Sequence, residues 1–218
     1  MSKILPVIVA PHKLLLQTSA PVKAVDDSIR ATLDDMLDTL YAADGVGLAA
    51  PQVGILQRLV MVDLGTERPD GKRDYSKPKP QAFINPEITW KSTELRYHQE
   101  GCLSIPGIYA DVERADRVKV KWLDRDGAPH EAEFDGLRAT VLQHEIDHLD
   151  GVLFLKRLSR LQRERMEKKY SKLLPDFLDH AKYAVSVEGR GVIDACAHDH
   201  SHDHGHGHVH GPHCNHDH

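Results

Sequence analysis

The sequence predicts an α+β domain in which short antiparallel or mixed strands pack around a central buried helix, followed by a C-terminal helix and a disordered tail. Three observations predict this class. Helical and strand periodicities do not alternate regularly, so a doubly wound parallel sheet fits poorly. One segment, residues 137–149, has apolar side chains at helical spacing. The last residues, 198–218, have almost no apolar side chains.

Composition narrows the class of protein further. The chain has 218 residues, enough for one domain with a hydrophobic core. With 28 Lys and Arg against 33 Asp and Glu, it has no overall basic field, so we do not expect sequence-specific nucleic-acid binding. The three cysteines are odd in number and widely spaced, which favours a reducing compartment over a disulfide framework. No apolar run indicates a secretory signal or a membrane span, so we expect a cytoplasmic protein.

The first half of the chain predicts one helix and two strands. Residues 26–43 have Ile, Leu and Met at three-and-four spacing, which is typical of an amphipathic helix. Residues 58–64 and 82–90 are rich in β-forming side chains, and Pro86 indicates an edge strand or a bulge in the second of them. Between these strands, residues 67–80 are rich in Pro, Gly and charge and predict a surface excursion.

The second half predicts a hairpin and then the buried helix. Residues 118–123 alternate between apolar and polar side chains, and a turn over 124–127 leads to a second strand over 130–134. Residues 137–149 are apolar at helical spacing and contain no Gly or Pro. We therefore expect a buried helix there.

A last helix and a tail complete the chain. Ser159 and Gln162 have the spacing of a capping box, and Pro175 is expected to follow the end of the helix. We place the folded domain in residues 1–185 and a His-rich disordered tail in residues 186–218.

The buried helix contains the sequence HEIDH. His144 and His148 are four residues apart and so lie on one helix face, where both imidazoles can reach one metal ion. Glu145 can then act as general base on a metal-bound water. The alternative is a charged helix with incidental histidines, but burial of these polar groups without a metal or other partners is costly.

Cys102 is the best candidate for a third ligand, because a catalytic site of this kind has three protein ligands and an open position. It is the only cysteine within the predicted domain, and Gly101 beside it gives the backbone freedom. A lone cysteine is more often a small buried hydrophobe, and the sequence does not prove that it meets the histidines.

Residues 45–52, GVGLAAPQ, leave the backbone bare, so that a substrate can pair with it as an added strand. Gln52 at the end of the segment can donate its amide to a developing oxyanion. A tight connection between helix and strand, packed closely for steric reasons, is the alternative.

Together the three segments resemble the peptide deformylase family. That family has GxGLAAxQ, EGCLS and QHExDHLxG in this order, and this chain has GVGLAAPQ at 45–52, EGCLS at 100–104 and QHEIDHLDG at 143–151. The similarity of layout covers residues 4–175. Three matched motifs in order are far more specific than HExxH alone.

The resemblance implies hydrolytic removal of the N-terminal formyl group from the formyl-methionine of nascent polypeptides, with release of formate by a metal-activated water. It implies Cys102, His144 and His148 as metal ligands and Glu145 as acid and base. The same resemblance assigns the substrate side of the site: Gln52 and the Leu103 N–H on the oxyanion, Gly47 on the substrate, and Val46, Leu137, Thr140 and Val141 around the methionine side chain.

Further roles follow from the same resemblance. The metal is expected to be Fe(II), with Zn, Ni or Co as alternatives. Arg114 is expected to pair with Glu100. Asp147 is expected to help position the metal ligands without binding the metal itself. Tyr109 stands where some relatives place a basic residue near the later residues of the substrate, so the preference beyond the second residue stays open.

Two basic or metal-binding segments have open interpretations. Ten of the sixteen histidines lie in residues 198–218 and are expected to bind extra metal ions, either to buffer or deliver metal or as a solvated appendage. The last helix is expected to have a crowd of cations that form a solvated face or a contact with the ribosome: Arg157, Arg160, Arg163, Arg165, Lys168, Lys169 and Lys172.

Two rival functions share the HExxH motif or the metal chemistry. A zinc endopeptidase uses the same motif, but its usual third ligand is a His or Glu rather than a cysteine. A metal-storage protein on an inactive hydrolase body would bind several metals without turnover. The presence of Glu145 and Gln52 argues against that second rival.

Overall fold

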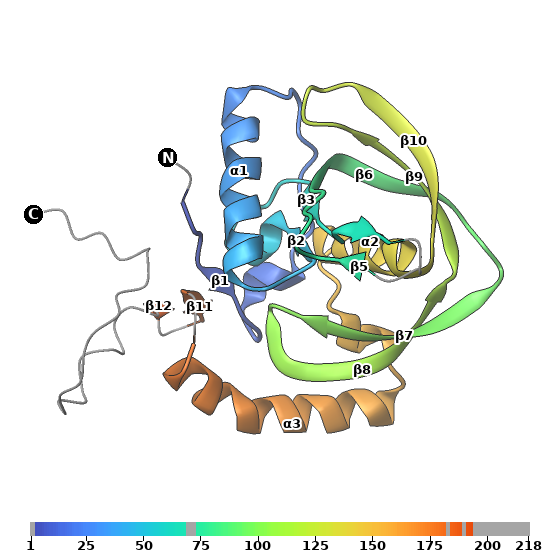
Figure 1. The fold of residues 1–218 in the computed structure, drawn as a ribbon. Coiled ribbons are helices and arrows are strands. Elements are labelled where there is room, and N and C mark those ends of the chain that lie inside the picture. Colours follow the sequence, from blue (N-terminus) through green and yellow to red (C-terminus); the bar gives the residue numbers. More distant parts are fainter. Residues whose placement is uncertain (1–2, 69–72, 182–183, 189–190, 194–218) are drawn as a thin grey trace, which may run out of the picture.

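A central antiparallel sheet with one helix on each face organises the chain (Figure 1). The computed structural model describes residues 3–68, 73–181, 184–188 and 191–193. Three α-helices are present in this part of the chain: α1 (Asp27–Ala42), α2 (Gly136–Leu149) and α3 (Arg160–Asp179). The predicted α+β class is confirmed. Among the described helices, none has the length and hydropathy that crossing a membrane requires.

The sheet has five strands in the order β10-β9-β6-β3-β2, and all neighbours are antiparallel. Its strands are β2 (Gly47–Ala49), β3 (Leu59–Val62), β6 (Gln81–Lys91), β9 (Arg117–Leu123) and β10 (Pro129–Asp135). Four of these lie where the sequence predicts strands. The strand β2 is at the edge, within the segment expected to accept a substrate.

The alternation along β3 explains how both faces of the sheet are covered. Val60 and Val62 belong to the apolar cluster that includes the buried residues of α2. Leu59 and Met61 point the other way, into the cluster formed with α1. Because successive side chains of a strand point to opposite faces, one short strand contributes to two cores.

The predicted irregularity at Pro86 is a bulge rather than an edge. Strand β6 lies between β9 and β3, and its register with β9 shifts between Ile84 and Glu87. Asn85 has a φ of 52°, and its side chain bonds to the backbone of Val22 in both directions at 2.8 Å. A proline is tolerated here because the ladder is already interrupted.

A long hairpin forms a second layer under α2 (Figure 1). It consists of β7 (Leu95–Cys102) and β8 (Ile105–Ala115), and the sequence patterns did not predict either strand. Its inner side packs with α3 and with the short helix η3 (Phe154–Arg157) in an apolar cluster that contains Ile108. The strand β7 is mostly polar and so lacks the alternation of apolar and polar side chains by which a strand is predicted.

The last helix continues through Pro175, and the predicted end before this proline is wrong. A proline inside a helix removes one hydrogen bond and strains the preceding turn. Here Leu178, beyond the proline, is buried in a cluster with Val9, Val185 and Val187, and Phe177 packs against that cluster. Burial of the last turn offsets the local cost.

The predicted domain boundary at residue 185 falls inside a small sheet. The strand β11 (Val185–Val187) pairs with β1 (Val7–Ile8) in parallel and with β12 (Gly191–Ile193) in an antiparallel manner. The folded part therefore continues to Ile193, because the N-terminal strand supplies a partner that a local pattern does not reveal. The tail prediction for residues 194–218 lies outside the described residues.

The remaining elements are short. The excursion between β3 and β6 contains the paired strands β4 (Thr66–Glu67) and β5 (Arg73–Asp74). Its base is held by the buried carboxylate of Asp63, which accepts hydrogen bonds from the backbone of Gly65 and Lys79 and from the hydroxyl of Tyr41. Two 3-10 turns complete the fold: η1 (Lys13–Leu16) and η2 (Ala50–Val53).

Candidate metal centre

The helix α2 brings three ionisable side chains into the interior. Residues 139–149 are all buried, among them His144, Glu145 and His148. One turn of helix separates the two imidazoles, whose ring centroids are 5.0 Å apart. A helix buried on all sides has no solvated face for these groups, so their partners must come from the protein or from a bound ion.

Cys102, at the end of β7, faces the two histidines. Its Sγ lies 3.2 Å from His148 Nε2, and one donor atom from each of Cys102, His144 and His148 lies within 4.8 Å of the other two. One thiolate and two imidazoles, with further positions open, form a donor set that suits a divalent transition metal. The residues present therefore fit a metal centre.

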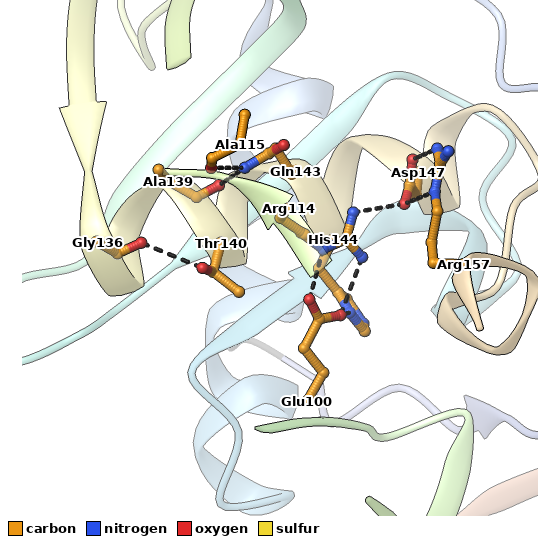
Figure 2. A network of polar contacts seen from close by, with 10 residues as sticks. All are labelled: Glu100, Arg114, Ala115, Gly136, Ala139, Thr140, Gln143, His144, Asp147 and Arg157. Carbon is orange, nitrogen blue, oxygen red and sulfur yellow. Dashed lines mark hydrogen bonds and ion pairs between the residues drawn. The ribbon is translucent and has the colours of Figure 1, made fainter. Parts of the chain in front are cut away.

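Glu100 forms a hydrogen bond with the Nδ1 nitrogen of His144. His144 Nδ1 lies 2.8 Å from Glu100 Oε2, while Arg114 binds both oxygens of the same carboxylate (Figure 2). Burial alone raises the pKa of Glu100, but hydrogen bonds from Arg114 and His144 outweigh it and hold the value at about 2. An ionised carboxylate thus fixes the imidazole so that its Nε2 is left for the metal.

Asp147 links the Glu100–Arg114 pair to the short helix η3. Its carboxylate accepts a 2.8 Å bond from Arg114 Nη1 and a 3.0 Å bond from Arg157 Nε (Figure 2). The expected pairing of Arg114 with Glu100 is confirmed. Asp147 contacts Arg114 and is thereby connected to the Glu100–His144 pair. Two carboxylates and two guanidinium groups balance each other in charge, which offsets their desolvation.

Gln52, in η2, approaches the sulfur of Cys102 and is almost wholly buried. Its Oε1 accepts a 2.8 Å hydrogen bond from the Ala49 N–H, so its amide nitrogen is turned toward the centre. That nitrogen lies 3.2 Å from Ser104 Oγ and 3.6 Å from Cys102 Sγ. The sequence predicts Gln52 at this place but does not indicate Ser104 as its partner.

Glu145 lies against the backbone of β2. A Cβ at Gly47 would be 2.4 Å from Glu145 Oε1, so only glycine leaves room for the carboxylate at this point. The other oxygen is buried and has no hydrogen-bond partner among the described residues. Burial raises the pKa of Glu145 to about 7, a value at which a carboxyl group can both accept and return a proton near neutral pH.

A cavity of about 420 Å³ opens in front of these groups. It lies between the loop before β2, the first half of α2 and the turn of the β7–β8 hairpin. All the residues predicted for the substrate side line it: Val46, Gly47, Gln52, Leu103, Leu137, Thr140 and Val141. His148 does not line the cavity and lies deeper in the core. The expected site residues thus come together in one place, with the metal donors at its inner end.

The chain matches the model of the polypeptide deformylase family over residues 4–164. It belongs to the peptide deformylase family. A peptide deformylase from Methylocella silvestris is 49% identical over 167 residues, which are 77% of this chain and 83% of the relative. The structure of a Synechococcus elongatus peptide deformylase in complex with actinonin is 42% identical, with a TM-score of 0.71, and the match covers 78% of this chain and 90% of that one.

A third similar protein is a class I type b peptide deformylase from Acinetobacter baumannii, solved with Met-Ala-Ser bound. It is 39% identical with a TM-score of 0.66, and the match covers 72% of this chain and all of that chain, 100%. Membership of the peptide deformylase family makes the protein a metal-dependent hydrolase that removes the N-terminal formyl group from nascent polypeptides. The endopeptidase and metal-storage alternatives are therefore set aside as the main activity.

Sequence reasoning missed two side chains of this centre. Ser104 is fully buried and accepts a hydrogen bond from the Gln52 amide, and its place two residues after Cys102 in the EGCLS segment was the available signal. Arg157 was counted with the surface cations of the last helix, but it lies in η3 and binds Asp147. No local pattern distinguishes it from its exposed neighbours.

We predict that Glu100→Gln lowers metal affinity by about 10- to 100-fold, because the amide neither orients His144 as a carboxylate does nor neutralises Arg114. Competition with a chelator measures the affinity. Glu87→Gln is the matched control, since Glu87 is an exposed partner of Lys121 on β6. Equal affinities for the folded Glu100→Gln variant and the parent would contradict the role of this carboxylate.

Proposed function

We propose that the deformylase works with Fe(II) held by Cys102, His144 and His148. The proposal rests on the convergence of their three donor atoms at the inner end of the cavity, beside Glu145. Zn, Ni and Co suit the same thiolate and imidazole donors and are the alternatives. Fe(II) comes first because members of the resembled family commonly use ferrous iron.

A divalent cation in this place supplies Lewis acidity, which makes water acidic and polarises a carbonyl group. Glu145 accepts the proton of the attacking water and returns it to the leaving amine, so the formyl C–N bond breaks and formate and a free N-terminus result. The amide of Gln52 and the N–H of Leu103 donate to the formyl oxygen as it gains charge. The fixed orientation of the Gln52 amide supports its part in this scheme.

The methionine side chain is proposed to enter the space lined by Val46, Leu137, Thr140 and Val141. Three of these four side chains are aliphatic, which suits an unbranched thioether. The substrate backbone runs along β2, where Gly47 leaves the chain bare and one edge of the sheet has no neighbouring strand. The Acinetobacter baumannii relative was solved with the tripeptide Met-Ala-Ser bound, which supports a peptide ligand that begins with methionine.

We predict that Glu145→Ala keeps its metal but loses about 10²- to 10⁴-fold in turnover, because the proton acceptor is gone while the ligands remain. The assay is formate release from a formyl-Met peptide by protein purified without oxygen and reloaded with Fe(II). Glu131→Ala, an exposed change on β10, is the control and should keep full activity. An active Glu145→Ala enzyme would contradict the mechanism, and turnover of an acetyl-Met peptide would contradict the proposed specificity.

The His-rich segment is proposed to bind additional metal ions. Ten histidines and Cys214 alternate with Asp and Gly over residues 198–218, a composition typical of metal-binding tracts. A chain ending at residue 197 keeps β12 and should bind one Zn ion in vitro, whereas the full chain binds several. Equal iron loading of both forms in metal-poor cells would exclude a role of the His-rich segment in metal delivery. The segment would then be a solvated appendage.

The helix α3 is proposed to contact the ribosome, since the substrate is a nascent chain. Its exposed face has an excess of cations, although Arg160 and Arg163 have acidic partners at i+4. We predict that the triple variant Lys168→Gln, Lys169→Gln, Lys172→Gln co-sediments less with ribosomes than the parent at low salt. Absent or salt-insensitive co-sedimentation of the parent would favour the alternative, a solvated face. The expected cytoplasmic location follows from the same substrate and stays a prediction.

A further inference from the structure

The outer side of the β7–β8 hairpin is an exposed surface that the proposed chemistry does not use. The outward positions are 95, 97, 99 and 101 of β7 and 107, 109, 111 and 113 of β8, and all of them are exposed. Inward positions such as Val112 and Glu100 are buried against the rest of the domain. We refer to these eight outward positions as the hairpin face.

The hairpin face begins inside the catalytic cavity. Gln99, Gly101 and Tyr109 belong to it and also line the cavity. The ring of Tyr109 lies on the backbone of Gly101, because a Cβ there would be 2.6 Å from Tyr109 Cε1. A substrate that leaves the cavity on this side therefore meets the Tyr109 ring, which is 62% exposed, and then the rest of the hairpin face.

Carboxylates and tyrosines alternate along this surface. In the register of the hairpin, Gln99 is opposite Asp111 and Tyr97 is opposite Glu113. Tyr97 is 67% exposed, and its hydroxyl is hydrogen-bonded to Glu113. Tyr97 thus contacts an exposed acidic group, and Tyr109 is two residues from Asp111 on the same face of β8.

No lysine or arginine occupies the hairpin face, every position of which the structure describes. Arg96 is exposed, but strand alternation places it on the other side of β7, where it pairs with Asp116 at 2.6 Å. The mouth of the cavity adds a further acidic residue, Asp44. The surface that continues from the cavity is therefore acidic and aromatic without compensating cations.

We propose that the hairpin face binds the downstream part of the nascent chain and favours lysine or arginine there. The inference rests on the proposed function, because it extends the same substrate beyond the cavity. Exposed carboxylates attract cationic side chains, and the faces of tyrosine rings add a cation–π attraction within about 6 Å. On the hairpin face both features occur together, at Tyr97 with Glu113 and at Tyr109 with Asp111.

Strand geometry gives the positions concerned. Residues of an extended chain advance about 3.3 Å each, so the Gln99–Asp111 pair is about 7 Å beyond the Gly101–Tyr109 pair and the Tyr97–Glu113 pair about 13 Å beyond it. With the third residue of the substrate beside Tyr109, the fifth lies near Asp111 and the seventh near Glu113. These are the positions at which the sequence of the nascent chain should affect the rate.

The test compares three substrates of the iron-loaded enzyme at low salt. They are formyl-Met-Ala-Ser, formyl-Met-Ala-Ser-Ala-Lys-Ala-Lys and formyl-Met-Ala-Ser-Ala-Glu-Ala-Glu. We expect kcat/KM for the lysine peptide to exceed that for the glutamate peptide by about threefold to tenfold, as weak exposed ion pairs allow. At high salt the ratio should fall below about two, because exposed charges are screened.

The double variant Asp111→Asn, Glu113→Gln should remove this preference and leave turnover of the tripeptide unchanged. The matched control Asp126→Asn, Glu131→Gln makes the same change in net charge on the β9–β10 side of the domain and should keep the preference. Equal kcat/KM for the two heptapeptides, or loss of the preference in the control as well, would overturn the docking proposal. Failure of the parent to process formyl-Met-Ala-Ser would instead overturn the proposed chemistry and the inference together.

Discussion

The contact between Glu100 and His144 determines how the rest of the centre is built. Glu100 and Cys102 are two residues apart on β7 and so share one face, about 7 Å apart along the strand. His144 and His148 are four residues apart on α2, about 6 Å along the helix axis. Once Glu100 is joined to His144, these similar spacings bring Cys102 opposite His148, where Sγ and Nε2 are 3.2 Å apart.

The same contact explains why so many charges are buried in a domain of this size. A carboxylate that orients an imidazole in the core requires a counter-charge, which Arg114 supplies from β8. Arg114 in turn shares Asp147 with Arg157, so the chain of charges ends at a side chain that reaches solvent. Four elements, β7, β8, α2 and η3, are thereby fixed in one mutual arrangement, and loss of Arg114 would leave the buried carboxylate of Glu100 without its guanidinium partner.

The helical half of this centre could be predicted from sequence and the strand half could not. The spacing of His144 and His148 is a local property of an α-helix, so the pattern alone places both imidazoles on one face. The position of Cys102 depends on a hairpin whose inward positions include Glu100 and Arg114, and charged residues at inward positions conceal a strand from any search for apolar alternation. The family resemblance supplied the link that local patterns lacked.

Long-range packing accounts for the other differences between expectation and structure. Pro175 should end a helix by local rules, but burial of Leu178 continues the helix for another turn. The strand β11 pairs with the nearby β12, but its other partner, β1, lies at the opposite end of the chain. In each case the deciding contact joins segments more than a hundred residues apart, which periodicity within a short window does not detect.

The packing of Gly47 against Glu145 relates the fold to the choice of substrate. The Glu145 carboxylate occupies the space where any larger residue at position 47 would place its Cβ, so little room is left for the substituents of a reacting carbon beside these two groups. A formyl carbon carries only a hydrogen besides its oxygen and nitrogen, whereas an acetyl carbon carries a methyl group. Because β2 and α2 pack together in the core, Gly47 and Glu145 cannot move apart without disturbing the sheet. We therefore propose that the close packing of β2 against α2 contributes to selection for the formyl group.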